Sequence, residues 1–326
     1  MTILILGGCG FLGRNLTDFL VDKGFNLRVV CKTVQNKIDN NVEYVTGDVT
    51  ETDSILNVFD KDVEVIVDLA GSVGGVKGSS SYLASIESYI KLNVYSKVRL
   101  IQYAEKFESR IIFASSEEVY GLNPQVPWKE NSLNIFGESG NPRSIFGLCK
   151  LLTEHFLLSA SENGTLKSTI LRLSNVYGKY QKPYLVIPRM ISSALLKSEV
   201  IVYGSGKQKR SFLYVDDAID AIYRIIEKGN NANGIFNVGS KEEITIEELA
   251  HRIISIAGLS KSSIKQLNIS NATNMKNFKD LDRKVLDTAK IHKVVGWVPK
   301  TDLSKGLNET FDWYNSHRDW WNTYVT

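Results

Sequence analysis

Cysteine, histidine and long hydrophobic runs are all scarce in this sequence. The three cysteines, Cys9, Cys31 and Cys149, are odd in number and far apart and form no CxxC pair, which argues against a disulfide framework and a zinc site. The four histidines show no metal-ligand spacing, so we expect no metal. No apolar run approaches the roughly 20 residues that cross a bilayer, and the apolar residues 1–6 lack a basic leader. We therefore expect a cytoplasmic protein that neither spans a membrane nor carries a secretion signal.

The sequence also lacks a large excess of charge of either sign. The net charge is +3, and the basic cluster at residues 207–210 is short and typical of a solvated loop. Nucleic-acid binding needs a longer basic stripe with interleaved aromatic residues, so we expect no nucleic-acid partner. With 326 residues, 43% of them hydrophobic and 23% charged, the composition is that of a globular protein with one large domain or two smaller ones.

The sequence does contain a regular alternation of strand and helix patterns over its first 175 residues. This alternation predicts an α/β fold, a Rossmann-type doubly wound parallel sheet with helices on both faces. Strands are expected at residues 2–6, 27–31, 42–46, 65–69, 110–114 and 168–173. Helices are expected at about residues 12–23, 52–59, 82–107 and 144–161. Ligands of such sheets bind outside the carboxyl ends of the strands.

The alternation stops after Tyr177, where glycine, proline and polar turns become frequent. A smaller C-terminal substrate-binding lobe is predicted to begin there. Helices are expected at residues 216–228, 245–257 and 307–321, and a short strand at 235–238 lets the chain return to the first sheet. We expect residues 1–178, with about 212–240, to form the dinucleotide-binding domain, and residues 179–211 with 241–326 to form the lobe.

A glycine-rich turn follows the first expected strand and opens the first helix. Gly7, Gly10 and Gly13 allow a tight turn and a close approach of the backbone to a ligand. The helix start, next to Phe11 and Leu12, offers free N–H groups and a positive dipole end to a pyrophosphate. The position of this pattern between a strand and a helix predicts dinucleotide binding.

The acidic residue expected some 20 positions later, which would hold the adenine ribose, is missing. The second strand ends in Cys31 followed by Lys32, so a 2'-phosphate is not repelled and Lys32 could pair with it. NADP is therefore slightly favoured over NAD. At the end of the third strand, Asp48 and Val49 are expected beside the adenine.

Further motifs follow along nearly the whole chain, in a specific order and spacing. They are Asp68-Leu69-Ala70-Gly71, Asn93, the segments at residues 115–121, 172–178, 202–206, 212–217 and 236–239, the residues Arg283 and Asp287, and the segment at 295–299. With the glycine turn, they resemble the extended short-chain dehydrogenase/reductases that modify nucleotide-sugars, the NAD-dependent epimerase/dehydratase family. The resemblance implies a nucleotide-diphosphate-sugar substrate and a homodimer joined by the helices at 82–107 and 144–161.

The resemblance also implies roles for individual residues. Ser116 matches the hydroxyl that binds the sugar oxygen being oxidised, and Lys150 matches the lysine that holds the nicotinamide ribose. Asn175 matches a residue near the substrate phosphates. Arg210 and Arg283 match arginines that grip the diphosphate, a task that suits the planar guanidinium. The coenzyme-binding part of the pattern also includes Leu69, Ala70 and Asn93.

One residue that the resemblance requires is absent. Phe146 stands four residues before Lys150, where the family carries the tyrosine that removes the sugar hydroxyl proton, and the two positions share a helix face. Loss of a general base typically costs about 10² to 10⁴ in rate. Three explanations are open: an engineered tyrosine replacement that traps ligands, a natural variant in which another group takes the proton, and a redox-silent protein that binds a nucleotide-sugar or NADP without turnover.

Two adjacent carboxylates follow Ser116. Glu117 and Glu118 resemble the acidic pair of sugar-nucleotide 4,6-dehydratases. The resemblance implies that, after oxidation at C4, Glu118 removes the C5 proton and Glu117 protonates the departing C6 hydroxyl. The loop at residues 72–76 instead resembles that of GDP-sugar epimerase/reductases acting at C3 and C5. We expect an NAD(P)-dependent nucleotide-sugar epimerase/dehydratase that first oxidises the hexose at C4 and is dehydratase-like, with an epimerase or reductase as the alternative.

Overall fold

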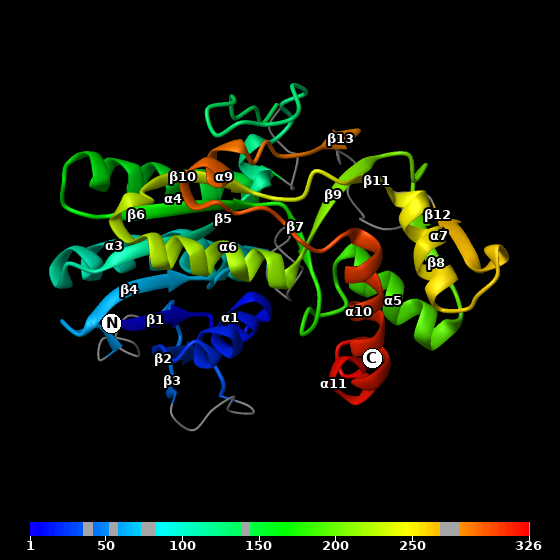
Figure 1. The fold of residues 1–326 in the computed structure, drawn as a ribbon, viewed down its shortest axis with the longest axis horizontal. Coiled ribbons are helices and arrows are strands. Elements are labelled where there is room, and N and C mark those ends of the chain that lie inside the picture. The colour runs from blue at the N-terminus through cyan, green and yellow to red at the C-terminus, as the bar shows by residue number, and fades with distance from the viewer. Residues whose placement is uncertain (35–41, 52–57, 73–81, 138–143, 268–280, 326) are drawn as a thin grey trace.

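A seven-stranded parallel sheet forms the larger part of the molecule. The computed structural model describes residues 1–34, 42–51, 58–72, 82–137, 144–267 and 281–325, and Figure 1 shows the sheet and its helices on one side and a smaller lobe on the other. The strand order is β10-β6-β5-β4-β1-β2-β3, and all neighbours are parallel. The strands are β1 (Thr2–Leu6), β2 (Asn26–Cys31), β3 (Glu43–Thr46), β4 (Val63–Asp68), β5 (Arg110–Ser116), β6 (Ser168–Leu173) and β10 (Gly234–Val238). The predicted Rossmann-type fold is confirmed.

Alternate residues of each strand face opposite sides of the sheet and supply two separate cores. On β1, Ile3 and Ile5 pack into one core and Leu4 and Leu6 into the other. The first face is covered by α1 (Phe11–Asp22), α6 (Val215–Lys228) and α9 (Ala289–Val295), and the second by α3 (Ser96–Phe107) and α4 (Ser144–Glu162). Burial on both faces explains why the strands are nearly continuous apolar runs.

A π-helical turn interrupts the helix expected over residues 82–107. The segment runs as α2 (Tyr82–Ile90), the turn Lys91–Tyr95 and then α3. The turn buries Asn93. Its side-chain nitrogen donates to the Tyr89 carbonyl at 3.1 Å, and its side-chain oxygen accepts from the Ser72 backbone amide at 3.2 Å. Such turns often occur at functional sites. The helix expected at 307–321 is also divided, into α10 (Leu303–Ser316) and α11 (Arg318–Asn322).

The smaller lobe is built from short strands and helices of the second half of the chain. Its helices are α5 (Val186–Lys197), α7 (Ile246–Ile256), α10 and α11, and its parallel pair is β8 (Val200–Tyr203) with β12 (Ile264–Leu267). A second small sheet links the lobe to the large one: β9 (Lys209–Tyr214) pairs with β7 (Asn175–Tyr177), β11 (Glu243–Thr245) and β13 (Arg283–Lys284). Short 3-10 turns occur at Glu117–Tyr120, Gly229–Asn231 and Lys261–Ser263.

The cysteines correct one expectation from the sequence. Cys9 and Cys31 form a disulfide, with their Cα atoms 5.5 Å apart, whereas Cys149 is free and buried. The glycine turn brings the two together, because the amides of Gly7 and Gly8 both donate to the Val30 carbonyl at the end of β2. The separation of 22 residues hides this proximity in the sequence.

Two expectations concern residues outside the described ranges: most of the helix at 52–59 and residues 73–76 of the loop at 72–76. Among the residues that the structure does describe, no helix combines the length and the apolar character needed to cross a membrane. The same residues contain no cluster of histidine, cysteine and carboxylate side chains that could hold a metal ion.

Candidate active site

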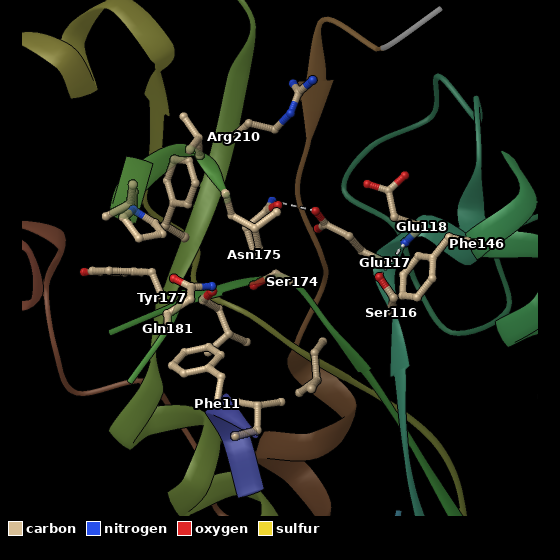
Figure 2. Close-up of a pocket in the computed structure, with 18 of the residues that line it drawn as sticks. Phe11, Ser116, Glu117, Glu118, Phe146, Ser174, Asn175, Tyr177, Gln181 and Arg210 are labelled. Atoms are coloured by element: carbon tan, nitrogen blue, oxygen red, sulfur yellow. Dashed lines mark hydrogen bonds between the residues drawn. The ribbon is translucent and has the colours of Figure 1, made fainter. Parts of the chain in front are cut away.

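A cavity of about 580 Å³ lies at the carboxyl ends of the central strands, between the large sheet and the lobe. Its lining is mostly apolar, with polar side chains concentrated at β5, β7 and β9. Figure 2 shows its two sides, with Ser116, Glu117, Glu118 and Phe146 on one and Tyr177, Gln181 and Arg210 on the other. The cavity is therefore at the place where doubly wound sheets bind their ligands.

The glycine turn packs too closely for side chains. A Cβ atom on Gly13 would lie 2.2 Å from the Gly7 carbonyl oxygen, and one on Gly7, whose φ is +77°, would lie 2.9 Å from the Ala70 backbone. The N-cap residue of α1, Gly10, supplies no side-chain cap, and the first turn contains no acidic residue. Phe11 and Leu12 in that turn line the cavity. These features fit a dinucleotide pyrophosphate at the helix start.

The residues expected around the adenine lie away from the cavity lining. Lys32 forms an ion pair with Asp48 at 2.6 Å, and Asp48 also accepts from the amide and hydroxyl of Thr50. Partial burial opposes the charged carboxylate, but the bonds from Lys32 and Thr50 outweigh it and hold the pKa of Asp48 below its usual value. Val49 packs against the second core. Lys32 is thus already engaged with a carboxylate.

Lys150 is buried in the cavity wall. Its Nζ donates to the Ala114 carbonyl at 2.7 Å and lies 4.5 Å from the centre of the Phe113 ring. Burial, and then the positive charge of Lys97, lower the pKa of Lys150 to about 8. Lys97, which the sequence did not single out, is itself buried and pairs with Asp68 at 2.8 Å.

Phe146 occupies the expected position beside the lysine. It lines the cavity, and its ring centre lies 5.8 Å from the Lys150 Nζ. Behind it, Phe146 packs in a small cluster with Tyr89 and Cys149. The hydroxyl of Tyr89 is buried without a hydrogen-bond partner among the described residues, and burial raises the pKa of this phenol. Tyr89 does not belong to the cavity lining, so it does not replace the missing phenol.

The two glutamates of the Glu117–Tyr120 turn face different partners. Ser116 caps the turn by accepting from the Glu118 amide at 3.2 Å. Glu117 accepts from the side-chain amide of Asn175 at 2.7 Å, as Figure 2 shows. Glu118 accepts at both oxygens from Lys284, at 2.9 and 3.1 Å. Both carboxylates are thus held by specific partners in the cavity wall.

Lys284 is the main residue that the sequence analysis missed. It is 2% exposed, lies on β13, and comes 166 positions after Glu118. The neighbouring Arg283, which was expected at the diphosphate, points the other way and forms a two-pronged ion pair with Glu243, at 2.6 Å for both contacts. Strand alternation separates the two neighbours. The structure brings Arg210 into the cavity with Ser116 and Asn175, but not Arg283.

Two further polar atoms of the cavity lining lack hydrogen-bond partners among the described residues. The Ser174 hydroxyl and the Gln181 amide oxygen are buried and make no hydrogen bond there, although both residues line the cavity. Buried polar atoms normally find a partner, so these two atoms indicate a polar ligand. Ser174 lies inside a motif noted in the sequence, whereas no sequence signal marked Gln181.

A buried network fixes α4 against the sheet behind the cavity. Glu154, one turn after Lys150, accepts from Arg172 at 2.6 Å and from the Ser115 hydroxyl at 2.5 Å. Arg172 also lies 4.8 Å over the ring of Tyr120. Because Ser115 precedes Ser116 and Glu154 follows Lys150 on the same helix, this network sets the position of both cavity residues.

Comparisons with known proteins agree with this geometry. Residues 3–239 match the model of the NAD dependent epimerase/dehydratase family. A UDP-N-acetyl-alpha-D-glucosaminuronate decarboxylase from Bacillus cytotoxicus is 31% identical over 321 residues, covering 95% of this chain and 97% of the relative. A Thermotoga maritima UDP-glucose 4-epimerase solved with UDP-glucose is 28% identical, with a TM-score of 0.82 and coverage of 97% and 99%. A Bacillus anthracis dTDP-glucose 4,6-dehydratase solved with NAD has the same fold, with a TM-score of 0.84, 24% identity and 99% coverage of both chains. The chain belongs to the NAD-dependent epimerase/dehydratase family.

Proposed function

We propose that this protein is a nicotinamide-dinucleotide-dependent enzyme that oxidises the hexose of a nucleotide-diphosphate-sugar at C4 and then acts as a 4,6-dehydratase. The observation that supports this most is the gathering of Ser116, Glu117, Glu118, Lys150 and Arg210 around one cavity. The decarboxylase and the 4-epimerase noted above act on nucleotide-sugars by their names, which supports the substrate class.

The glycine turn and Lys150 are the residues that we propose hold the coenzyme, which supplies a hydride acceptor when it is bound. Ser116 is placed to bind the sugar oxygen, and Arg210 is placed to bind the diphosphate. Lys284 favours the charged form of Glu118, as a proton acceptor at C5 requires. The amide of Asn175 likewise favours charged Glu117 and so opposes its expected role as an acid. The contacts therefore support Glu118 as the base more than they support Glu117 as the acid.

For the coenzyme, the missing carboxylate after β2 supports NADP, but the Lys32–Asp48 ion pair weakens that preference. A 2'-phosphate near Lys32 would meet the Asp48 carboxylate as well. Isothermal calorimetry of both coenzymes with the protein and with Lys32→Ala tests the point. A preference for NADP that disappears in the variant supports Lys32 as the phosphate partner, and equal affinities in both proteins contradict it.

The site is also proposed to work in a homodimer, as the family resemblance implies. Helices α2 and α4 carry exposed apolar side chains, and on α4 these are Leu148, Leu152 and Phe156. Their spacing of four residues places them in one stripe on the helix surface. An apolar stripe of this kind fits the same stripe of a second copy related by a twofold axis.

Product mass is the direct test of the reaction. The protein and its Phe146→Tyr variant are incubated with NAD or NADP and with UDP-, dTDP-, GDP- or CDP-hexoses. A product lighter by one water, lost in Glu118→Gln and retained at a reduced rate in Glu117→Gln, supports the dehydratase. A product of unchanged mass and inverted configuration supports the epimerase instead.

The rival from another class is a redox-silent protein that senses a nucleotide-sugar or NADP, and Phe146 is the observation in its favour. Turnover by the Phe146→Tyr variant alone indicates an engineered or decayed enzyme. If neither protein turns over any of these sugars while calorimetry shows that they bind, the catalytic proposal is wrong and the sensor stands.

A further inference from the structure

We propose that Lys150 is itself the general base that takes the sugar hydroxyl proton in this chain, in place of the phenol that Phe146 lacks. The inference rests on the proposed oxidation of a hexose in the same cavity. It assigns to Lys150 a proton-accepting role in addition to the coenzyme-holding role that the family resemblance implies.

The first argument is position. The Lys150 Nζ is hydrogen-bonded to the carbonyl of Ala114, which lies two residues before Ser116 on the same strand. All three residues line the cavity. Two residues of strand span about 6.6 Å, so a sugar hydroxyl bound at Ser116 comes within reach of the Lys150 amine through one water. Proton transfer through one water is an accepted geometry for general-base catalysis.

The second argument is the charge around the amine, considered element by element. On β4, Asp68 is engaged by Lys97 of α3, whose Nζ contacts both carboxylate oxygens at 2.9 and 2.8 Å. On α4 itself, Glu154 is engaged by Arg172. Cys149, the residue before Lys150, contributes only a buried thiol, whose pKa burial raises. Within the described part of the chain, no carboxylate forms an ion pair with Lys150.

These surroundings favour the neutral amine. A fully buried ammonium without a carboxylate partner, and with the second ammonium of Lys97 nearby, loses its proton more readily, which agrees with the pKa of about 8. Lysines whose pKa is lowered by burial are known as general bases. At pH 7 to 8 a useful fraction of Lys150 is therefore in the basic form.

The other basic groups of the cavity are less suitable. Glu118 is the group that we propose for the C5 proton, and Glu117 is bonded to Asn175. The phenol of Tyr177 is buried, and burial raises its pKa beyond the working range of a base. None of these groups lies on the α4 face that Phe146 and Lys150 share.

The proton balance is simple. The hydroxyl O–H bond at C4 breaks, the proton passes to the lone pair on the Lys150 Nζ, and the amine becomes an ammonium. The C4 hydrogen leaves with its electron pair as hydride, for which the nicotinamide of a bound coenzyme would be the acceptor, so the sugar is oxidised to the 4-keto form. Because the product of the proposed dehydration keeps the 4-keto group, the ammonium releases its proton to water before the next turnover.

The pH dependence of the first turnover tests the proposal. In the protein with Phe146, the rate of sugar oxidation is expected to rise about tenfold per pH unit below pH 8 and to level off above it, because the neutral amine is the reactive form. The matched control is Phe146→Tyr, in which the phenol takes the proton, so its rate is expected to lose this dependence on the Lys150 amine. Lys150→Arg, which keeps the charge but cannot deprotonate, is expected to lower the rate more in the Phe146 background than in the Phe146→Tyr background.

A second readout needs no turnover. NMR of the protein carrying ¹³C-labelled lysine, with Lys150→Met to assign the signal, gives the pKa of Lys150 directly. A titration near pH 8 supports the proposal, and a titration above pH 10 overturns it. Turnover by Phe146→Tyr, with none by the protein with Phe146 at any pH from 6 to 9.5, also overturns it while the proposed function stands. Failure of both proteins to turn over any nucleotide-sugar overturns the two together.

Discussion

Lys284 illustrates how one buried side chain can hold a group that we propose to be catalytic, Glu118. Its side chain is 2% exposed and contacts Glu118, whose side chain is only 16% exposed. Water therefore has little access to either charge. Arg283, its neighbour on the strand, pairs with Glu243 on an open surface. The two adjacent residues therefore allow a buried ion pair to be compared with an exposed one.

We expect Lys284→Met to destabilise the protein by about 3 kcal/mol, because it removes the buried cation that contacts both oxygens of the Glu118 carboxylate. The control Arg283→Gln is expected to cost less than about 1 kcal/mol, as is usual for an exposed ion pair. Urea unfolding of both variants measures the difference. Equal losses would mean that the Lys284 contact contributes no more than a surface pair.

The cysteines give a second test at this scale. The untreated protein is expected to show no reactive thiol while folded and one, Cys149, after unfolding, and a reductant is expected to raise the number to three. Removing the crosslink by Cys9→Ser is expected to cost about 3 kcal/mol, the value for a loop of this size. Ellman titration and urea unfolding measure these quantities. Three thiols in the untreated, unfolded protein would contradict the disulfide.

Among the elements, the turn from β1 into α1 carries the tightest constraints. The Cβ atom of an alanine at position 13 would overlap the Gly7 carbonyl, so the first turn of α1 must shift. Gly13→Ala is therefore expected to lose about 1 to 3 kcal/mol of stability and most coenzyme affinity. The control Asp22→Ala, an exposed change at the other end of α1, is expected to keep both. Calorimetry with NAD and thermal unfolding distinguish them.

The elements also show what could be predicted from the sequence. The central strands were predicted well: β1 and β6 have the expected bounds, and the others differ by a few residues. The physical reason is that a sheet buried on both faces leaves continuous apolar runs in the sequence. The π-helical turn at Lys91–Tyr95 was not predicted, because it changes the helical period over a single turn. In the site, positions next to strands such as Ser116 were found from motifs, whereas Lys97 and Lys284 depend on contacts between distant segments that periodicity does not encode. The division of the chain into two domains and the roles of the site residues stay predictions.

At the scale of the whole molecule, the apolar stripe on α4 predicts association. Leu152, which is 42% exposed, is replaced by glutamate, and the expected result is a shift from dimer to monomer in analytical ultracentrifugation, because a charge in an apolar contact is costly. The matched control is Leu196→Glu on α5, where the leucine is 43% exposed but lies on the lobe. A monomeric parent protein, or equal effects of the two changes, would contradict the proposed interface.

The pairing of Glu118 with Lys284 also bears on how the protein is made. During synthesis the glycine turn, β5 and α4 leave the ribosome long before residue 284, so a nascent chain can assemble the coenzyme-binding half while Glu118 still lacks this cation. Docking of β13 beside β9 is then the late event that places the ammonium. Coenzyme affinity should therefore emerge earlier in translation than the capacity to move a proton at the sugar.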